Sequence, residues 1–207
     1  MWVLYFAGYN QTMTGKPKNP LVISYPRSGV NWFSRAFETL TGARSPGQDR
    51  GIVPEQPAAF KRTHSTKAKR LKRVILSGGC DSALLLLRDP AWSYVRRTSC
   101  GYPFRAYLQN IHFYHWCPAP KKLVYFEDLF TPQTLYDIVE WMGFPYTPFK
   151  DFKKALAESK AWYHKQKHPN YVRRNPTKKD IAEARRRCIQ SLGKELVREY
   201  LGRYIRV

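Results

Sequence analysis

Three short segments of the chain carry side chains that could bind or transfer an anionic group. They follow apolar runs and read Y-P-R-S-G at 25–29, R-T-H-S at 62–65 and R-D-P at 88–90. Arg27, Arg62 and Arg88 are permanent cations whose forked donors match phosphate oxygens. His64 has an ordinary pKa close to neutral pH, so its imidazole could act as a general base.

The first segment has the position of a phosphate-binding loop, because it lies between a strand pattern at 21–24 and a helical pattern at 31–40. Backbone N–H groups from Ser28 onward can point at an anion there, and the start of the helix adds partial positive charge. Gly29 allows close approach or an unusual φ. Trp32 could either stack on a purine or pack in the core.

This loop lacks the signature of a nucleoside triphosphate site, G-x-x-x-x-G-K-[ST]. Residues 25–32 contain a single glycine, no lysine, and no hydroxyl directly after the glycine that could hold Mg²⁺. A metal-dependent nucleotide enzyme is therefore disfavoured.

The elements that position these segments alternate along the chain. Strand patterns lie at 21–24, 83–90 and 121–129, and helical patterns at 31–40, 91–99, 104–116, 131–142 and 181–197. This alternation predicts an α/β fold in which helices flank a mostly parallel central sheet. Ligands of such sheets lie beyond the carboxyl ends of the strands, so the three segments should meet at one active site. With no repeat or linker, we expect one domain over 1–207.

The charge of the chain is strongly basic, with 36 Lys and Arg against 15 Asp and Glu and a formal net charge of +21. This excess indicates an anionic partner such as nucleic acid, an anionic membrane or glycan, or a highly charged nucleotide, although a solubilising surface explains part of it. The four cysteines, Cys80, Cys100, Cys117 and Cys188, form no C-x-x-C pair, so a metal site is not expected. Without a signal-peptide pattern or a long apolar run, we expect a cytoplasmic protein with no transmembrane segment.

Other polar residues have simpler explanations than catalysis. Glu127 and Asp128 are expected to cap and to pair with nearby arginines. His112 and His115 are expected to belong to a packed helix with an aromatic face, because no third metal ligand is evident. The run R-R-R at 185–187 is expected on the solvated face of an amphipathic helix.

Four motifs, in order, resemble the PAPS-dependent sulfotransferases, which use 3′-phosphoadenosine 5′-phosphosulfate. S-Y-P-R-S-G-V-N-W at 24–32 is similar to their 5′-phosphosulfate loop, Y-P-[KR]-S-G-[TS]-x-W. K-R-T-H-S at 61–65 resembles their [KR]-T-H segment, and L-L-L-L-R-D-P-A-W-S-Y at 84–94 resembles the strand, turn and helix that bind the 3′-phosphate. L-V-Y-F-E-D-L at 123–129 resembles their Y-E-D-L strand, and the resemblance covers about residues 21–145.

The resemblance implies a P-loop-like three-layer fold in a short member of the family, and sulfuryl transfer to an acceptor hydroxyl or amine without a metal. It leaves 3′-phosphoadenosine 5′-phosphate as the product. His64 would be the general base, while Arg27 and Arg62 would stabilise developing charge. The residues that it places on the nucleotide are Arg27, Ser28, Gly29, Val30, Asn31, Trp32 and Arg88.

The sequence departs from the family pattern in the 5′-phosphosulfate loop and in the segment that binds the 3′-phosphate. Val30 and Asn31 stand where the family often has small hydroxyl residues, so the backbone and Asn31 must do more. The usual serine eight residues after the 3′-phosphate arginine is replaced by Arg96. Either Ser93, one helical turn earlier, takes its role or Arg96 itself contacts the phosphate.

A third departure is the missing R-K-G-x-x-G segment that closes over the 3′-phosphate in many members. The basic stretch N-Y-V-R-R-N-P at 170–176 lies at roughly the same place. Arg173 and Arg174 are therefore candidates for the nucleotide site, with a solvated loop as the alternative.

Two other functions remain as alternatives to a sulfotransferase. One is a P-loop enzyme like a nucleotide kinase, and the other is a non-catalytic nucleic-acid-binding module. We expect the acceptor to be a small molecule or a glycan, with nucleic acid not the main partner. The identity of the acceptor and the oligomeric state stay open.

Overall fold

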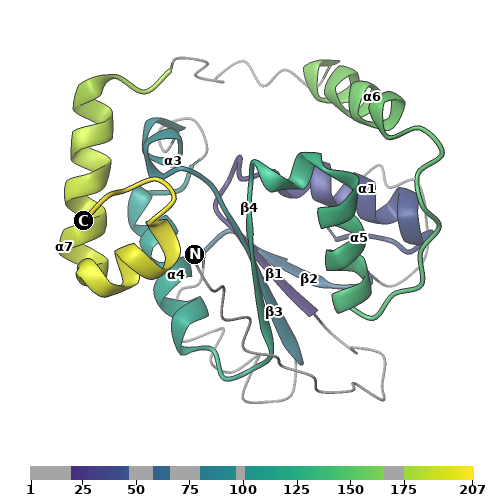
Figure 1. The fold of residues 1–207 in the computed structure, drawn as a ribbon, viewed down its shortest axis with the longest axis horizontal. Helices are drawn as coiled ribbons and strands as arrows, with labels where there is room; N and C mark the ends of the chain where they lie inside the picture. The colour runs from purple at the N-terminus through teal and green to yellow at the C-terminus, as the bar shows by residue number, and fades with distance from the viewer. Residues whose placement is uncertain (1–19, 47–57, 66–79, 97–100, 166–174) are drawn as a thin grey trace, which may run out of the picture.

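The computed structural model describes residues 20–46, 58–65, 80–96, 101–165 and 175–207. At its centre lies a sheet of four strands in the order β2-β1-β3-β4, and every pair of neighbours is parallel (Figure 1). The strands are β1 (Pro20–Ser24), β2 (Lys61–Thr63), β3 (Ser82–Leu87) and β4 (Lys121–Tyr125). The parallel sheet that the sequence predicted is confirmed within these residues.

Helices cover both faces of the sheet (Figure 1). They are α1 (Val30–Thr41), α3 (Pro90–Arg96), α4 (Phe104–Trp116), α5 (Pro132–Trp141), α6 (Phe152–Lys165) and α7 (Lys178–Leu201). Side chains of β1 alternate between the two faces: Ile23 packs into one cluster with α3, α4 and α7, and Val22 packs into another with α1, α5 and α6. Burial on both faces explains why β1 and β3 are apolar apart from Ser24 and Ser82 at their ends.

The predicted strand at 121–129 is wrong in its length and its burial. The strand β4 ends at Tyr125, and a short 3₁₀ turn, η1 (Asp128–Phe130), leads into α5. β4 is an edge strand in which only Val124 is buried, since it pairs with β3 alone. The apolar strand expected within 83–90 is confirmed up to Leu87, after which the charged segment R-D-P leads into α3.

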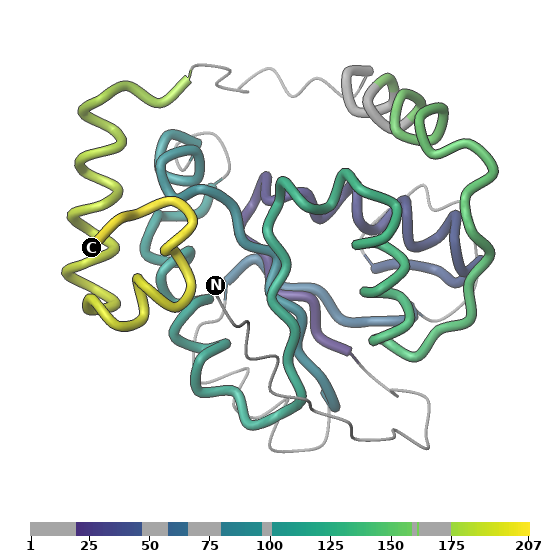
Figure 2. The backbone as a smooth tube through the Cα atoms, in the orientation of Figure 1, coloured from purple at the N-terminus to yellow at the C-terminus, as the bar shows by residue number. Residues whose placement is uncertain are grey.

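Two helices differ from the sequence-based expectation. The helix α6 was not predicted, and its residues Phe152 and Leu156 are only partly buried, against the cluster that contains residues of α1 and α5. The helix α7 is longer than predicted and is broken at Gly193, which has a φ of 77°. Figure 2 shows α6 and α7 on opposite sides of the molecule.

The apolar stripe predicted for α7 is confirmed by its packing. Ala184, Cys188 and Leu192 are buried against the face of the sheet that α3 and α4 cover. Among the residues described, none of the helices is long and apolar enough to cross a membrane.

The start of α7 is fixed by a capping box. The Asp180 backbone N–H donates to Thr177 Oγ1 over 3.2 Å, and the Thr177 backbone N–H donates to Asp180 Oδ2 over 3.0 Å. These two bonds satisfy donors that a helix start otherwise leaves without partners.

We predict that Thr177→Ala lowers the free energy of unfolding by about 1 kcal/mol, because the cap is lost. Urea denaturation measures this change. Thr39→Ala is the matched control, since Thr39 is an exposed helical threonine whose hydroxyl donates only to the Arg35 carbonyl. Equal changes in both variants would contradict the role of the cap.

Candidate functional site

The phosphate-loop candidate forms a tight turn between β1 and α1. The Ser28 backbone N–H donates to the Tyr25 carbonyl over 3.1 Å, which closes a β-turn with Pro26 at its second position. The third position is Arg27, with a φ of 72°. A type II turn needs a positive φ at that place and normally uses glycine. A non-glycine residue there carries backbone strain of roughly 1–3 kcal/mol, a feature that gathers at functional sites.

The next residue, Gly29, also has a positive φ of 85° and caps the start of α1. A Cβ atom at Gly29 would lie 2.7 Å from Leu129 Cδ1 and 2.9 Å from Phe126 Cδ2. Glycine is therefore required both by its φ and by the packing of the segment after β4. This close packing holds the turn against the edge of the sheet.

The loop has the chemistry of an anion cradle. The helix α1 begins at Val30, and the N–H groups of a helix's first turn have no partners within the helix. Ser28 is fully buried, and its hydroxyl has no hydrogen-bond partner among the residues described. An anionic oxygen at the loop would supply the missing partner, because a buried hydroxyl without one is costly.

His64 lies directly beyond β2, next to the end of β1. Its Nδ1 is 3.0 Å from the Ser24 carbonyl oxygen and 3.2 Å from Ser24 Oγ. A carbonyl can only accept, so Nδ1 carries the proton and Nε2 keeps its lone pair. Burial lowers the pKa of His64, and the Arg62 charge also lowers it, against the bond to Ser24. The bond to Ser24 thus orients the ring, and the lowered pKa favours its neutral form.

Two further side chains contact His64, and neither was expected there from the sequence. The ring of Tyr102 meets the imidazole edge to face, with centroids 5.7 Å apart. The Asn110 side-chain amide donates to the His64 carbonyl over 3.2 Å. Both residues follow the predicted R-D-P segment by more than ten positions, so no motif connected them with His64.

Arg62 joins the second segment to the loop. Its Nη1 donates to Asn31 Oδ1 over 3.3 Å, at the first turn of α1. Burial lowers the pKa of Arg62. Because the guanidinium is partly removed from water, its charge acts more strongly on an anion nearby than an exposed arginine would.

Arg88 joins the third segment to the same loop. Its Nη1 donates to the Arg27 carbonyl over 2.7 Å. Its guanidinium carbon lies 4.0 Å from the centre of the Phe126 ring and 5.3 Å from that of Trp92. The three predicted segments therefore meet at one edge of the sheet. Phe126 was not singled out from the sequence, although it directly follows β4 and so stands at this edge.

The two candidates for the role of the missing serine both lie on α3. Ser93 is buried, and its hydroxyl has no hydrogen-bond partner within the described residues. Arg96 is also buried, with its guanidinium carbon 4.9 Å from the Trp92 ring centre. Trp92 thus contacts Arg88 and Arg96 alike, which brings Arg96 close to the third segment. Which of the two contacts a phosphate stays a prediction.

Trp32 packs into the core, in agreement with the second of its two interpretations. Its Nε1 donates to the Leu129 carbonyl over 2.8 Å. Its ring stacks with Phe130 at a centroid distance of 6.3 Å and meets Phe152 edge to face. Arg173 and Arg174 lie outside the described residues.

The ion pair expected for Asp128 is confirmed, whereas the expected cap is not, because Glu127 precedes η1 without a side-chain capping hydrogen bond. Asp128 pairs with Arg203 over 2.7 Å, and the Tyr204 hydroxyl donates to Glu127. His112 and His115 contact α7 through the Ser191 carbonyl and the Tyr200 hydroxyl. The arginine that pairs with Asp128 comes from the far end of the chain, which the sequence did not indicate.

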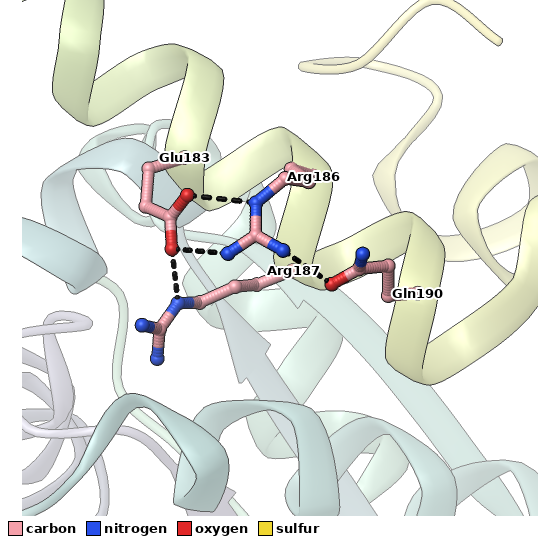
Figure 3. A network of polar contacts seen from close by, with 4 residues as sticks. All are labelled: Glu183, Arg186, Arg187 and Gln190. Carbon is pink, nitrogen blue, oxygen red and sulfur yellow. Dashed lines mark hydrogen bonds and ion pairs between the residues drawn. The ribbon is translucent and has the colours of Figure 1, made fainter.

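The basic run on α7 is solvated, as predicted. Arg186 and Arg187 are exposed and bind Glu183, and Arg186 also donates to Gln190 (Figure 3). The two arginines lower the pKa of Glu183 to about 2. Glu183 therefore offsets part of the positive charge of this run on the helix surface.

Comparison with known proteins adds no assignment. No family model matches the chain, and no curated protein sequence matches it.

We predict that Gly29→Ala destabilises the fold more than Gly42→Ala does. Both glycines have a positive φ, which costs an alanine roughly 1–2 kcal/mol. A Cβ at Gly42 meets nothing within 4 Å, whereas at Gly29 it overlaps Leu129 and Phe126, which adds about 1–3 kcal/mol. Urea unfolding of the two variants measures the difference, and equal losses would mean that the turn is not packed against Phe126.

Proposed function

We propose that the chain is a sulfotransferase that takes a sulfuryl group from 3′-phosphoadenosine 5′-phosphosulfate and gives it to an acceptor hydroxyl or amine. The observation that carries the proposal is the pairing of a strained turn at Arg27, directly after β1, with a candidate base, the His64 imidazole, whose Nδ1 is held by the Ser24 carbonyl at the end of β1. A site for a static anion would have no need of such a base.

In this reaction the protein's own groups manage one proton and the developing negative charge. His64 Nε2 takes the proton of the acceptor as the acceptor atom bonds to sulfur. The bond between sulfur and the bridging oxygen breaks, and its electron pair leaves with the nucleotide. Arg27 and Arg62 offset the charge that builds on the leaving oxygen and on the sulfuryl group. The bound nucleotide supplies the sulfuryl group.

The residues at the loop are consistent with this donor. The buried Ser28 hydroxyl and the first amides of α1 suit the 5′ end of the nucleotide, with Arg27 as the charge. Arg88, at the end of β3, is proposed for the 3′-phosphate, with Ser93 or Arg96 beside it. The packing of Trp32 makes it a support of the loop, so the purine would need another surface.

Two features weigh against the alternatives. A kinase-like enzyme would need a lysine and a Mg²⁺-holding hydroxyl after Gly29, and the sequence has neither. A nucleic-acid-binding module explains the charge of +21 but not the oriented His64. The parallel sheet with helices on both faces accords with the P-loop-like fold that the sulfotransferase resemblance implies.

We predict that 3′-phosphoadenosine 5′-phosphate raises the melting temperature more than ATP with Mg²⁺ does, because only a ligand of the native site stabilises the fold. Thermal shift assays measure this. Arg27→Ala should reduce the shift, since the loop loses its charge. No shift with the wild type, or an equal shift with ATP, would contradict the choice of donor. Steep loss of binding with salt, whatever the nucleotide, would favour the nucleic-acid alternative.

We predict that His64→Ala abolishes sulfuryl transfer and leaves nucleotide affinity nearly unchanged. Burial lowers the pKa of His64 below its ordinary value of 6.5, so the loss of wild-type kcat/KM on the acid side should have its midpoint below pH 6.5. The measurements are transfer of labelled sulfate to a panel of acceptors and the pH profile of that rate. Ser24→Ala, which keeps the backbone carbonyl that orients Nδ1, is the control and should retain most activity. Full activity of His64→Ala would exclude its role as the base.

A further inference from the structure

We propose that Arg88 is a positioning residue for the turn at residues 25–29. Its guanidinium packs on the Phe126 ring and holds the Arg27–Ser28 peptide in the geometry that binds the 5′ end of the nucleotide. The effect on the nucleotide rests on the proposed function, whereas the effect on the turn does not. In this proposal Arg88 couples the two phosphate subsites.

The first argument is how the Arg27–Ser28 peptide is held. This peptide is a rigid plane, with the Arg27 carbonyl on one side and the Ser28 N–H on the other. The Ser28 N–H donates to the Tyr25 carbonyl over 3.1 Å, and the Arg27 carbonyl accepts from Arg88 Nη1 over 2.7 Å. The plane is thus fixed from both ends, once within the turn and once from the end of β3.

The second argument is strain. Arg27 has a φ of 72°, a value that residues with a Cβ avoid unless the surrounding structure enforces it. The bond from Arg88 is short and comes from a charged donor, so it is among the stronger hydrogen bonds that a carbonyl can accept. It therefore offsets part of the strain at Arg27. The amides proposed to bind the anion begin at the next residue, Ser28.

The third argument is that Arg88 is itself supported. Its guanidinium lies 4.0 Å from the centre of the Phe126 ring, within cation–π range. Phe126 is in turn close to the position that a Cβ of Gly29 would take, and its ring meets Phe130 edge to face. The ring therefore contacts both Arg88 and the turn, and it fixes their relative positions.

This arrangement has a functional consequence. An anion at Arg88 and an anion at the turn would each favour the same conformation, so binding at one subsite should strengthen binding at the other. A residue that only touched the 3′-phosphate would leave a ligand without that phosphate unaffected. This difference makes the proposal testable.

The first experiment measures the turn without any ligand, by hydrogen exchange of a peptide that covers residues 25–33. Arg88→Met removes the donor and keeps an unbranched side chain, and it should speed exchange of the turn amides by about tenfold to a hundredfold. Arg185→Met is the matched control, because Arg185 makes the same kind of bond, to the Arg206 carbonyl over 2.7 Å, on the exposed face of α7. Unchanged exchange in Arg88→Met would overturn the proposal.

The second experiment compares two nucleotides by calorimetry, adenosine 5′-phosphosulfate without a 3′-phosphate and 3′-phosphoadenosine 5′-phosphate. Arg88→Met should weaken both, by about tenfold or more for the first. Weakening of the second alone would mean that Arg88 acts only on the 3′-phosphate, and would overturn the coupling. If the wild type binds neither nucleotide, the proposed function fails and the exchange result still decides the role of Arg88 in the turn.

Two substitutions of Phe126 test whether its ring orients Arg88. They also provide a second test of the proposal in case Arg88→Met fails to fold. Phe126→Tyr keeps the ring and should exchange and bind as the wild type does. Phe126→Leu removes the ring and should behave like Arg88→Met in both experiments. Wild-type behaviour of Phe126→Leu would exclude the ring as the support of Arg88.

Discussion

The parallel pairing of β1 with both of its neighbours is the constraint on which the candidate site depends. Ile23 pairs with Thr63 in β2, and Ser24 pairs with Leu86 in β3. This register brings the ends of the three strands to the same level, so His64 meets Ser24 and Arg88 meets Arg27. A shift of one residue in either pairing would separate these side chains, because it would also turn them to the other face.

The site is unusual in the way its charges are supported. Arg62 contacts Asn31 at the start of α1, and Arg88 lies against the Phe126 ring, so an uncharged side chain helps to orient each cation. On α7, Arg186 and Arg187 share the single carboxylate of Glu183, so this surface helix keeps positive charge of its own (Figure 3). Part of the net charge of +21 therefore lies away from the candidate site.

Much of the fold could be predicted from the sequence, because burial imposes a pattern on it. Strands β1 and β3 are buried on both faces and therefore read as continuous apolar runs. Helix α4 was predicted with its observed bounds. The helix α6 and the short edge strand β4 were missed or misjudged, since an element that buries few side chains leaves little trace in the sequence.

The sequence by itself determined which residues could do the chemistry and that they follow strands, because a parallel sheet gathers such residues at one edge. Only the tertiary structure decided how they are used. The orientation of His64 depends on the Ser24 carbonyl, which is 40 positions away, and the place of Arg88 depends on Phe126 and on the Arg27 carbonyl. Trp32 was assigned to the core by its bond to Leu129, 97 positions along the chain. Contacts between residues so distant in sequence leave no periodic pattern, and so they are known only once the chain is folded.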